Sequence, residues 1–343
     1  MPTDSICFGS ILKAYAELGT FKMKTKIILD TDPGIDDAMA ILFAEANPNV
    51  DLVALTTIFG NADIETSTRN ALYLKQRFGM NCDVAKGVSK PLLRDPVGAS
   101  TAVHGDNGFG DIALDAPTLA ADPRPAHQYI IDTVKASPNE ITLVAVGPLT
   151  NLAMAITQAP EIGDLVKEVV IMGGAFGTHE HTGNVTPFAE ANVHDDPHAA
   201  DIVFTADWPV TVIGLDVTHE TFFSTDYIDT LRDTCGEVGE FMWDISRFYL
   251  DFYKSRMDVD GCFVHDPSAI AYVIDPSLFT LREGPIRVVC DGPAEGLTIQ
   301  KYKPTKHKTD EWADKRPQHV AVAVNDQAVL DLYLDAMTQY GNR

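Results

Sequence analysis

Four aspartates lie within an eight-residue stretch near the start of the chain: Asp30-Thr31-Asp32-Pro33-Gly34-Ile35-Asp36-Asp37. The Pro33-Gly34 pair predicts a tight turn that folds Asp32 back toward Asp36 and Asp37. The last two aspartates would stand in the first turn of a helix, whose dipole stabilises a carboxylate by at most about 1 kcal/mol. That is too little to hold converging carboxylates away from water, and helix capping would need only one of them. The spacing therefore predicts a site for a divalent cation.

Two other kinds of acidic site can be compared by their spacing. An EF-hand loop starting at Asp30 needs glycine at its sixth position and glutamate at its twelfth, but the chain has Ile35 and Ile41 there. An aspartyl-phosphatase site would use Asp30 as nucleophile, with a hydroxyl residue shortly after Asp32 and a lysine further along the chain. Gly34 stands at the hydroxyl position, and no lysine is evident as the partner. The spacing thus excludes the EF-hand and gives the phosphatase no support.

Several other polar segments follow predicted strands or enter predicted helices. Taken alone, each has an ordinary structural role: a turn at Asn61, a helix cap at Thr150 or Asn151, and surface or packing positions for His104 and His265. The segments are Gly60-Asn61, Ala102–Gly108, Val146–Asn151, Met172–Gly174, Gly183–Asn192 and Val264–Ser268.

Short β-branched runs that alternate with longer amphipathic segments must position these side chains. Apolar runs without alternation predict strands covered on both faces, and hence an α/β fold with a mainly parallel, Rossmann-like open sheet flanked by helices. Ligands of such sheets collect at the carboxyl ends of the strands, where the polar segments stand. The predicted strands are Lys26–Leu29, Leu52–Ile58, Asp83–Ala85, Ile141–Val146, Glu168–Met172 and Val210–Leu215, and the predicted helices are Asp36–Ala46, Ile64–Phe78, Ala126–Ala136, Asn151–Thr157 and Pro197–Phe204.

The remaining part of the chain predicts additions to this sheet. Residues 224–257 are expected to form two helices, a cap-like insertion. The runs Ile286–Cys290, Gly296–Tyr302 and Val320–Val324 predict C-terminal β additions, and Gln327–Thr338 predicts a closing helix.

Composition limits the classes of partner. The chain has 343 residues and a formal net charge of −23, which argues against nucleic acid and anionic membranes as partners. No run of about 18 apolar residues predicts a membrane span. Five scattered cysteines without metal-binding spacing indicate reduced thiols in a cytoplasmic protein. We expect residues 1–22 to be a poorly ordered extension before a natural start at Met23, and residues 23–343 to form a single domain.

The segment Asp30–Asp37 resembles the signature of the inosine–uridine-preferring nucleoside hydrolases, and the resemblance extends over residues 23–340. It implies hydrolysis of the N-glycosidic bond of purine or pyrimidine ribonucleosides to ribose and free base. It also implies a homodimer or homotetramer and a Ca²⁺ cofactor. The ligands of the ion would be Asp32, Asp37, Asp266 and the backbone carbonyl of Val146.

The resemblance also assigns roles to the other polar segments. Asp32 would activate a Ca²⁺-bound water. His265 would protonate the leaving base, a task suited to a pKa near 6.5, and His104 matches a second histidine on the base side. The residues implied in ribose binding are Asp36, Asn61, Met172, Asn184, Glu190 and Asn192. Many members carry an aromatic residue at the position of Ala191, against the base. Ala191 therefore leaves base stacking, and with it base preference, open.

Two alternatives to an enzyme remain at this point. A nucleoside- or ribose-binding protein would bind substrate without releasing base, although the intact aspartates argue against it. A calcium-stabilised structural domain would melt at a lower temperature in EDTA and gain no stability from a nucleoside. Base contacts are expected from residues 224–257 and from the region around Val103. Tyr249 and Tyr253 are candidates there, with packing as the favoured interpretation.

Overall fold

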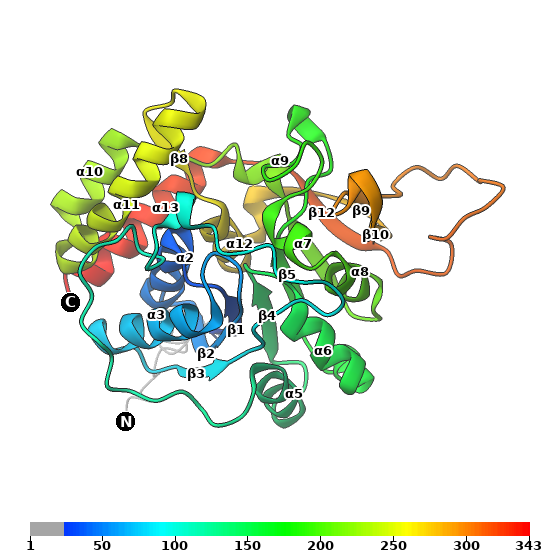
Figure 1. The fold of residues 1–343 in the computed structure, drawn as a ribbon, viewed down its shortest axis with the longest axis horizontal. Helices are drawn as coiled ribbons and strands as arrows, with labels where there is room; N and C mark the ends of the chain where they lie inside the picture. Colours follow the sequence, from blue (N-terminus) through cyan, green and yellow to red (C-terminus); the bar gives the residue numbers. More distant parts are fainter. Residues whose placement is uncertain (1–23) are drawn as a thin grey trace, which may run out of the picture.

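A computed structural model describes residues 24–343, so the predicted extension at 1–22 lies outside the described residues. The centre of the fold is an eight-stranded sheet with the order β3-β2-β1-β4-β5-β6-β12-β9 (Figure 1). Edge strand β9 runs antiparallel to β12, whereas the other neighbours pair in parallel. The strands are β1 (Thr25–Thr31), β2 (Val50–Thr57), β3 (Asp83–Lys86), β4 (Ile141–Ala145), β5 (Glu168–Met172), β6 (Val210–Ile213), β9 (Phe279–Gly284) and β12 (Gln318–Val324).

Helices cover both faces of the sheet, which divides the apolar interior into two cores (Figure 1). Side chains of β1 alternate between them, since Ile27 and Leu29 join the first core and Ile28 joins the second. The first core is formed with α2 (Ile35–Ala46), α3 (Ile64–Arg77), α10 (Thr225–Thr234), α11 (Gly236–Met257), α12 (His265–Ile274) and α13 (Asp326–Gly341). The second is formed with α5 (Ala126–Ala136), α6 (Thr150–Gln158) and α8 (Pro197–Thr205).

Shorter elements complete the fold. Two small antiparallel sheets pair β7 (Phe222–Ser224) with β8 (Gly261–Phe263), and β10 (Ile286–Val288) with β11 (Thr298–Gln300). The short helices are α4 (Thr101–His104), α7 (Ala191–Asp195) and α9 (Leu215–Thr218), with 3₁₀ turns at Pro160–Asp164, Thr178–Glu180, Pro276–Leu278 and Gly292–Ala294.

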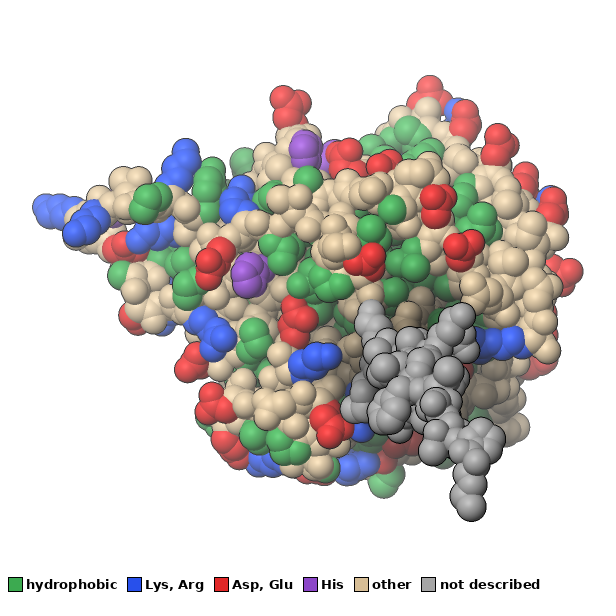
Figure 2. Space-filling view, turned by 180° about the vertical axis from the view of Figure 1, so that it is seen from behind, with side chains coloured by type: hydrophobic (Ala, Val, Ile, Leu, Met, Phe, Trp, Pro, Cys, Tyr) green, Lys and Arg blue, Asp and Glu red, His purple; other side chains and the backbone are tan. Residues whose placement is uncertain are grey.

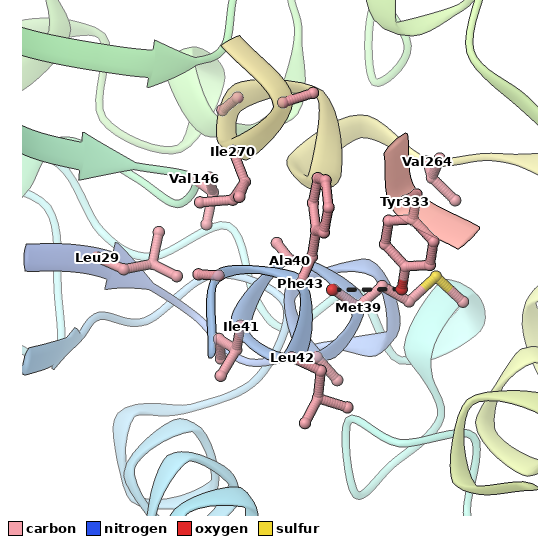
Figure 3. Packing of buried hydrophobic residues seen from close by; sticks show 14 of the residues in the cluster. Leu29, Met39, Ala40, Ile41, Leu42, Phe43, Val146, Val264, Ile270 and Tyr333 are labelled. Atoms are coloured by element: carbon pink, nitrogen blue, oxygen red, sulfur yellow. Dashed lines mark hydrogen bonds between the residues drawn. The ribbon is translucent and has the colours of Figure 1, made fainter. Parts of the chain in front are cut away.

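Helix α2 is the element that carries the acidic stretch into the interior. Every residue of the helix except Glu45 is buried, as expected for a helix that is apolar on all sides. Figure 3 shows Phe43 of this helix beside Tyr333 of α13, with Ile270 of α12 above it. The Phe43 and Tyr333 ring centroids are 4.8 Å apart, and the Tyr333 hydroxyl donates to the carbonyl of Met39 at 3.4 Å. Packing on several sides fixes the start of α2, and with it the aspartates.

The mainly parallel α/β sheet predicted from the sequence is confirmed, and so are the two helices within residues 224–257. Several predicted boundaries differ from the observed ones by one or two residues. The strand predicted to reach Leu215, for example, ends at Ile213, and Leu215 begins α9. The prediction also missed β9, whose sequence FTLREG contains adjacent charged residues, Arg282 and Glu283, and no long apolar run. An edge strand needs only one well-covered face, which weakens its apolar signal.

Acidic side chains are spread over the surface, as Figure 2 shows for one face, while Lys and Arg side chains gather on its protruding segment. Among residues 24–343, no helix combines the length and the apolar character needed to cross a bilayer. The described cysteines, at positions 82, 235, 262 and 290, are all free thiols.

The packing of α2 makes a prediction about stability. Phe43→Ala removes a fully buried ring, so we expect the free energy of unfolding to fall by about 3–5 kcal/mol in urea denaturation. Leu93→Ala is the control, because Leu93 is 74% exposed and should change the same quantity by no more than about 0.5 kcal/mol. Equal effects of the two substitutions would contradict the described packing.

Candidate active site

A cavity of about 500 Å³ opens where β1, β2, β4 and β5 end. Among the residues predicted from the sequence, the wall includes Asp36, Asn61, His104, Val146, Met172, Asn184, Glu190, Asn192, His265 and Asp266. Asp32 and Asp37 do not line the cavity but are buried close to these residues. The fold therefore brings together side chains that come from widely separated parts of the sequence, at the sheet edge where they were expected.

Asp37 fixes the shape of the acidic turn. Its carboxylate accepts hydrogen bonds from the Thr31 hydroxyl at 2.5 Å and from the Asn61 side-chain amide at 2.8 Å. It also accepts from the backbone N–H groups of Gly34 at 3.0 Å and Asp32 at 3.2 Å. The Pro33-Gly34 turn thus folds back as predicted, and Asp37 lies in the first turn of α2.

Asp32 occupies a tight cradle made by backbone. One carboxylate oxygen, Oδ2, accepts from the backbone N–H of Asn61 at 2.6 Å. A Cβ atom at Gly60 or at Gly147 would lie 2.1 or 2.6 Å from an Asp32 oxygen, so only glycine fits at these two positions. The other oxygen, Oδ1, is buried and has no hydrogen-bond partner among residues 24–343. A buried acceptor without a partner is costly, which points to a ligand at this atom.

The carboxylates converge without a compensating cation from the protein. Asp36, Asp37 and Asp266 each place an oxygen within 4.8 Å of the others. Burial, followed by repulsion from Asp37, raises the pKa of Asp36 to about 7. Burial and the neighbouring aspartates also raise the pKa values of Asp32 and Asp266 well above the ordinary range.

No Lys or Arg within the described chain forms an ion pair with any of these four groups. The donors are all hard carboxylate oxygens, which suit Ca²⁺ or Mg²⁺ rather than Zn²⁺. The unpartnered Asp32 oxygen and this donor set therefore fit a divalent cation.

Asp30, the first aspartate of the acidic stretch, was not among the predicted site residues and is not part of this cluster. Its Oδ1 accepts from the hydroxyl of Thr56 and from the side-chain amide of Asn151, and burial raises the pKa of Asp30 to about 7.

The expected helix cap at Thr150 or Asn151 was wrong, because Leu149 is the cap residue of α6. The side chains of both expected caps instead reach across the fold, with Thr150 donating to Asp196.

The residues predicted to bind ribose form a connected wall. The side-chain amide of Asn192 donates to the backbone carbonyls of Val146 at 3.0 Å and Met172 at 3.2 Å. Glu190 caps α7 and accepts from three backbone N–H groups, and the side-chain oxygen of Asn184 accepts from Ala191. Each of these side chains is therefore held in place by the backbone, with further atoms toward the cavity.

Burial changes the acid–base character expected for the two histidines. It lowers the pKa of His104 to about 3 and that of His265 well below 6.5, so both imidazoles are neutral at pH 7. The backbone N–H of Ile35 donates to Nδ1 of His104 at 3.1 Å, which places the His104 proton on Nε2. His265 hydrogen-bonds through Nδ1 with the Thr218 hydroxyl at 2.8 Å and through Nε2 with the Tyr253 hydroxyl at 3.0 Å.

Tyr249 and Tyr253 do more than the packing that the sequence favoured. Both line the cavity, and the Tyr249 hydroxyl lies 3.4 Å from Asp36 while Tyr253 contacts His265. Their spacing of four residues, which places both on one face of α11, was the available signal.

The sequence analysis did not identify His219 and Thr218 as site residues. They stand at the end of α9, the short helix that follows β6 at the carboxyl end of that strand.

Comparisons with known proteins find relatives that match nearly the whole chain. The family model described as inosine-uridine preferring nucleoside hydrolase matches residues 27–331. A probable uridine nucleosidase 2 of Arabidopsis thaliana is 40% identical over 320 residues, which cover 92% of this chain and 98% of the relative. An inosine-uridine preferring nucleoside hydrolase of Crithidia fasciculata is 39% identical over 93% of this chain and 99% of its own. The structure of a plant nucleoside hydrolase superposes with a TM-score of 0.89 at 37% identity, covering 92% of this chain and 99% of that one.

The neutral state of His104 predicts a pH dependence of stability. The unfolded chain takes up a proton on this histidine below about pH 6.5, whereas the folded chain does so only near pH 3. Within that window the unfolded state binds more protons, so stability falls as the pH falls, by about 1.4 kcal/mol per pH unit for one such group. We expect His104→Gln to lower the slope of unfolding free energy against pH by about this amount between pH 6 and 4, measured in EDTA. An unchanged slope would show that His104 is not buried and neutral.

Proposed function

The chain belongs to the inosine-uridine preferring nucleoside hydrolase family, and we propose that it cleaves uridine and inosine to ribose and free base with a Ca²⁺ ion as cofactor. Family membership and the fold make it a nucleoside hydrolase; the substrates, the ion and the residue roles are the proposal. The observation that carries it is the unpartnered, buried oxygen of Asp32 among converging carboxylates beside the cavity.

The ion would be held by Asp32, Asp37, Asp266 and the carbonyl of Val146, with Asp36 in the same group of oxygens. A bound Ca²⁺ supplies positive charge that acidifies an adjacent water molecule and attracts ribose hydroxyls. The side-chain amide of Asn192 donates to the Val146 carbonyl, so Asn192 stands next to one proposed ligand.

Breaking the bond between ribose and base leaves positive charge on the sugar. The aspartates stabilise that charge, because their negative field acts in a buried site where water screens little. Asp32 is the proposed general base, since its Oδ1 has no protein partner and its raised pKa favours proton uptake. Asp36, Asn61, Met172, Asn184, Glu190 and Asn192 are proposed to bind and orient the ribose.

The departing base needs a proton or a hydrogen bond, and we assign this role to His265, assisted by His104. Both are neutral, so each acts as an N–H donor rather than as a cation. The Tyr253 hydroxyl hydrogen-bonds with Nε2 of His265, and Tyr253 lines the cavity. We therefore include Tyr253 in the route by which the proton reaches the base.

The same proposal covers the organisation of the protein. Residues 23–343 would act as one cytoplasmic domain with the helices of 224–257 as its cap, and the active form would be a homodimer or homotetramer.

Turnover of inosine, adenosine, uridine and cytidine, with Ca²⁺ and with EDTA, tests the substrate and the ion together. Nucleoside binding without release of base would favour the alternative of a binding protein.

Asp32→Asn should leave the fold intact and lower kcat for inosine by at least about 100-fold, the low end of general-base contributions. The melting temperature, measured in parallel, reports whether the variant is folded. A kcat within threefold of the wild type would rule out Asp32 as the base.

His265→Ala should reduce cleavage of inosine more than cleavage of p-nitrophenyl riboside, whose leaving group needs no proton. The ratio of kcat/KM values for the two substrates measures this difference. Equal losses on both substrates would remove His265 from the role of acid.

A further inference from the structure

Aromatic rings in mutual contact form a belt beside the cavity, and most of them line its wall. Neighbouring ring centroids lie 5.6 Å apart for His104 and Tyr249, and 5.0 Å apart for Tyr249 and Tyr253. The belt continues through Phe263 to His219, with separations of 5.5 Å from Tyr253 to Phe263 and 5.1 Å from Phe263 to His219. It begins on α4 and α11 and crosses β8 to the end of α9. Of these rings, His104, Tyr249, Tyr253 and His219 line the cavity, while Phe263 lies behind them and connects Tyr253 to His219.

His219 occupies the far end of this belt. Its ring meets the His265 ring edge to face at 5.2 Å, and it lines the cavity. Neither of its nitrogens has a hydrogen-bond partner within residues 24–343, in contrast to His265, whose two nitrogens are both engaged. His104 has one nitrogen engaged, by Ile35. His219 is therefore the cavity imidazole that retains both an unused donor and an unused acceptor.

Helix α9 holds His219 in a fixed position. Asp216, in the same helix, accepts from the backbone N–H groups of Phe176 at 2.8 Å and Thr178 at 2.6 Å. Thr218, the preceding residue, holds His265. Burial lowers the pKa of His219 to about 4, so the ring is neutral and presents one N–H and one bare nitrogen.

We propose that His219 is a base-recognition residue, whose imidazole hydrogen-bonds the edge of the nucleobase and so contributes to substrate selection. This inference rests on the proposed function and specifies a contact for its substrate. Nucleobase edges carry donors and acceptors side by side, which a neutral imidazole can match. The position of Ala191 offers no ring to stack against the base, so recognition falls to other parts of the wall.

His219→Phe tests the contact, because it keeps a ring against His265 and Phe263 while removing both nitrogens. We expect kcat/KM for inosine or uridine to fall at least tenfold, and that for p-nitrophenyl riboside to fall at least five times less. His219→Asn or His219→Gln, whose amides carry a donor and an acceptor, should recover most of the loss. Equal losses on nucleosides and p-nitrophenyl riboside, or no loss on either, would overturn the proposal.

His181→Phe is the matched control. His181 lies 5.1 Å from His219 by ring centroids and pairs with Glu220 at 2.6 Å, but it does not line the cavity. This substitution should leave kcat/KM for every substrate within threefold of the wild type. A loss in this control that matches His219→Phe would mean that both act through packing, and would overturn the proposal.

Binding of the free bases separates this inference from the proposed function. Calorimetric titration with hypoxanthine and uracil should show at least tenfold weaker binding by His219→Phe than by the wild type, with ribose binding changed less than threefold. A wild-type protein that releases no base from any riboside would defeat the proposed function, while this titration would still test His219. Unchanged affinity for both bases would defeat the inference alone.

Discussion

Repulsion among buried carboxylates is the constraint on which the site depends. Asp32, Asp36, Asp37 and Asp266 are all buried, and their mutual repulsion adds to the cost of removing them from water. Backbone N–H groups and the amide of Asn61 offset part of that cost at Asp37, but Asp32 keeps an oxygen without a partner. The fold maintains this arrangement because α2, which carries Asp36 and Asp37, and α12, which carries Asp266, pack against each other within one core. The stability of the core thus supports an acidic cluster that would otherwise disperse into solvent.

The cavity divides into two chemically different parts. One part is lined by carboxylates and by amides held through backbone hydrogen bonds, which suit a polyol and a cation. The other is an aromatic belt with neutral imidazoles, which suits a flat, uncharged ring. A nucleoside has the same two halves, and charge that develops on its sugar during cleavage falls beside the carboxylates. The distribution of charge in the cavity therefore follows the distribution of charge in the reaction.

The sequence predicted the features that depend on local pattern. Uninterrupted apolar runs identified the parallel strands, and the Asp30–Asp37 stretch was recognisable because four carboxylates within eight residues require an explanation. Features that depend on three-dimensional neighbours were missed or wrong. The partners that hold Asp30 apart from the cluster, Thr56 and Asn151, are distant in sequence and could not be predicted. The low pKa values of His104 and His265 come from burial, which the sequence does not reveal. His219 was overlooked because its position on the cavity wall becomes visible only in the folded structure.

Calorimetric titration of the metal-free protein with Ca²⁺ at pH 6.5, in buffers of different ionisation enthalpy, tests the central claim most directly. Because burial raises the pKa of Asp36 to about 7 and raises those of its neighbours, the empty site should hold protons that the ion displaces. The account predicts one Ca²⁺ per chain, net proton release, and loss of binding in Asp37→Asn. No binding at millimolar Ca²⁺, or binding of equal strength in that variant, would contradict it.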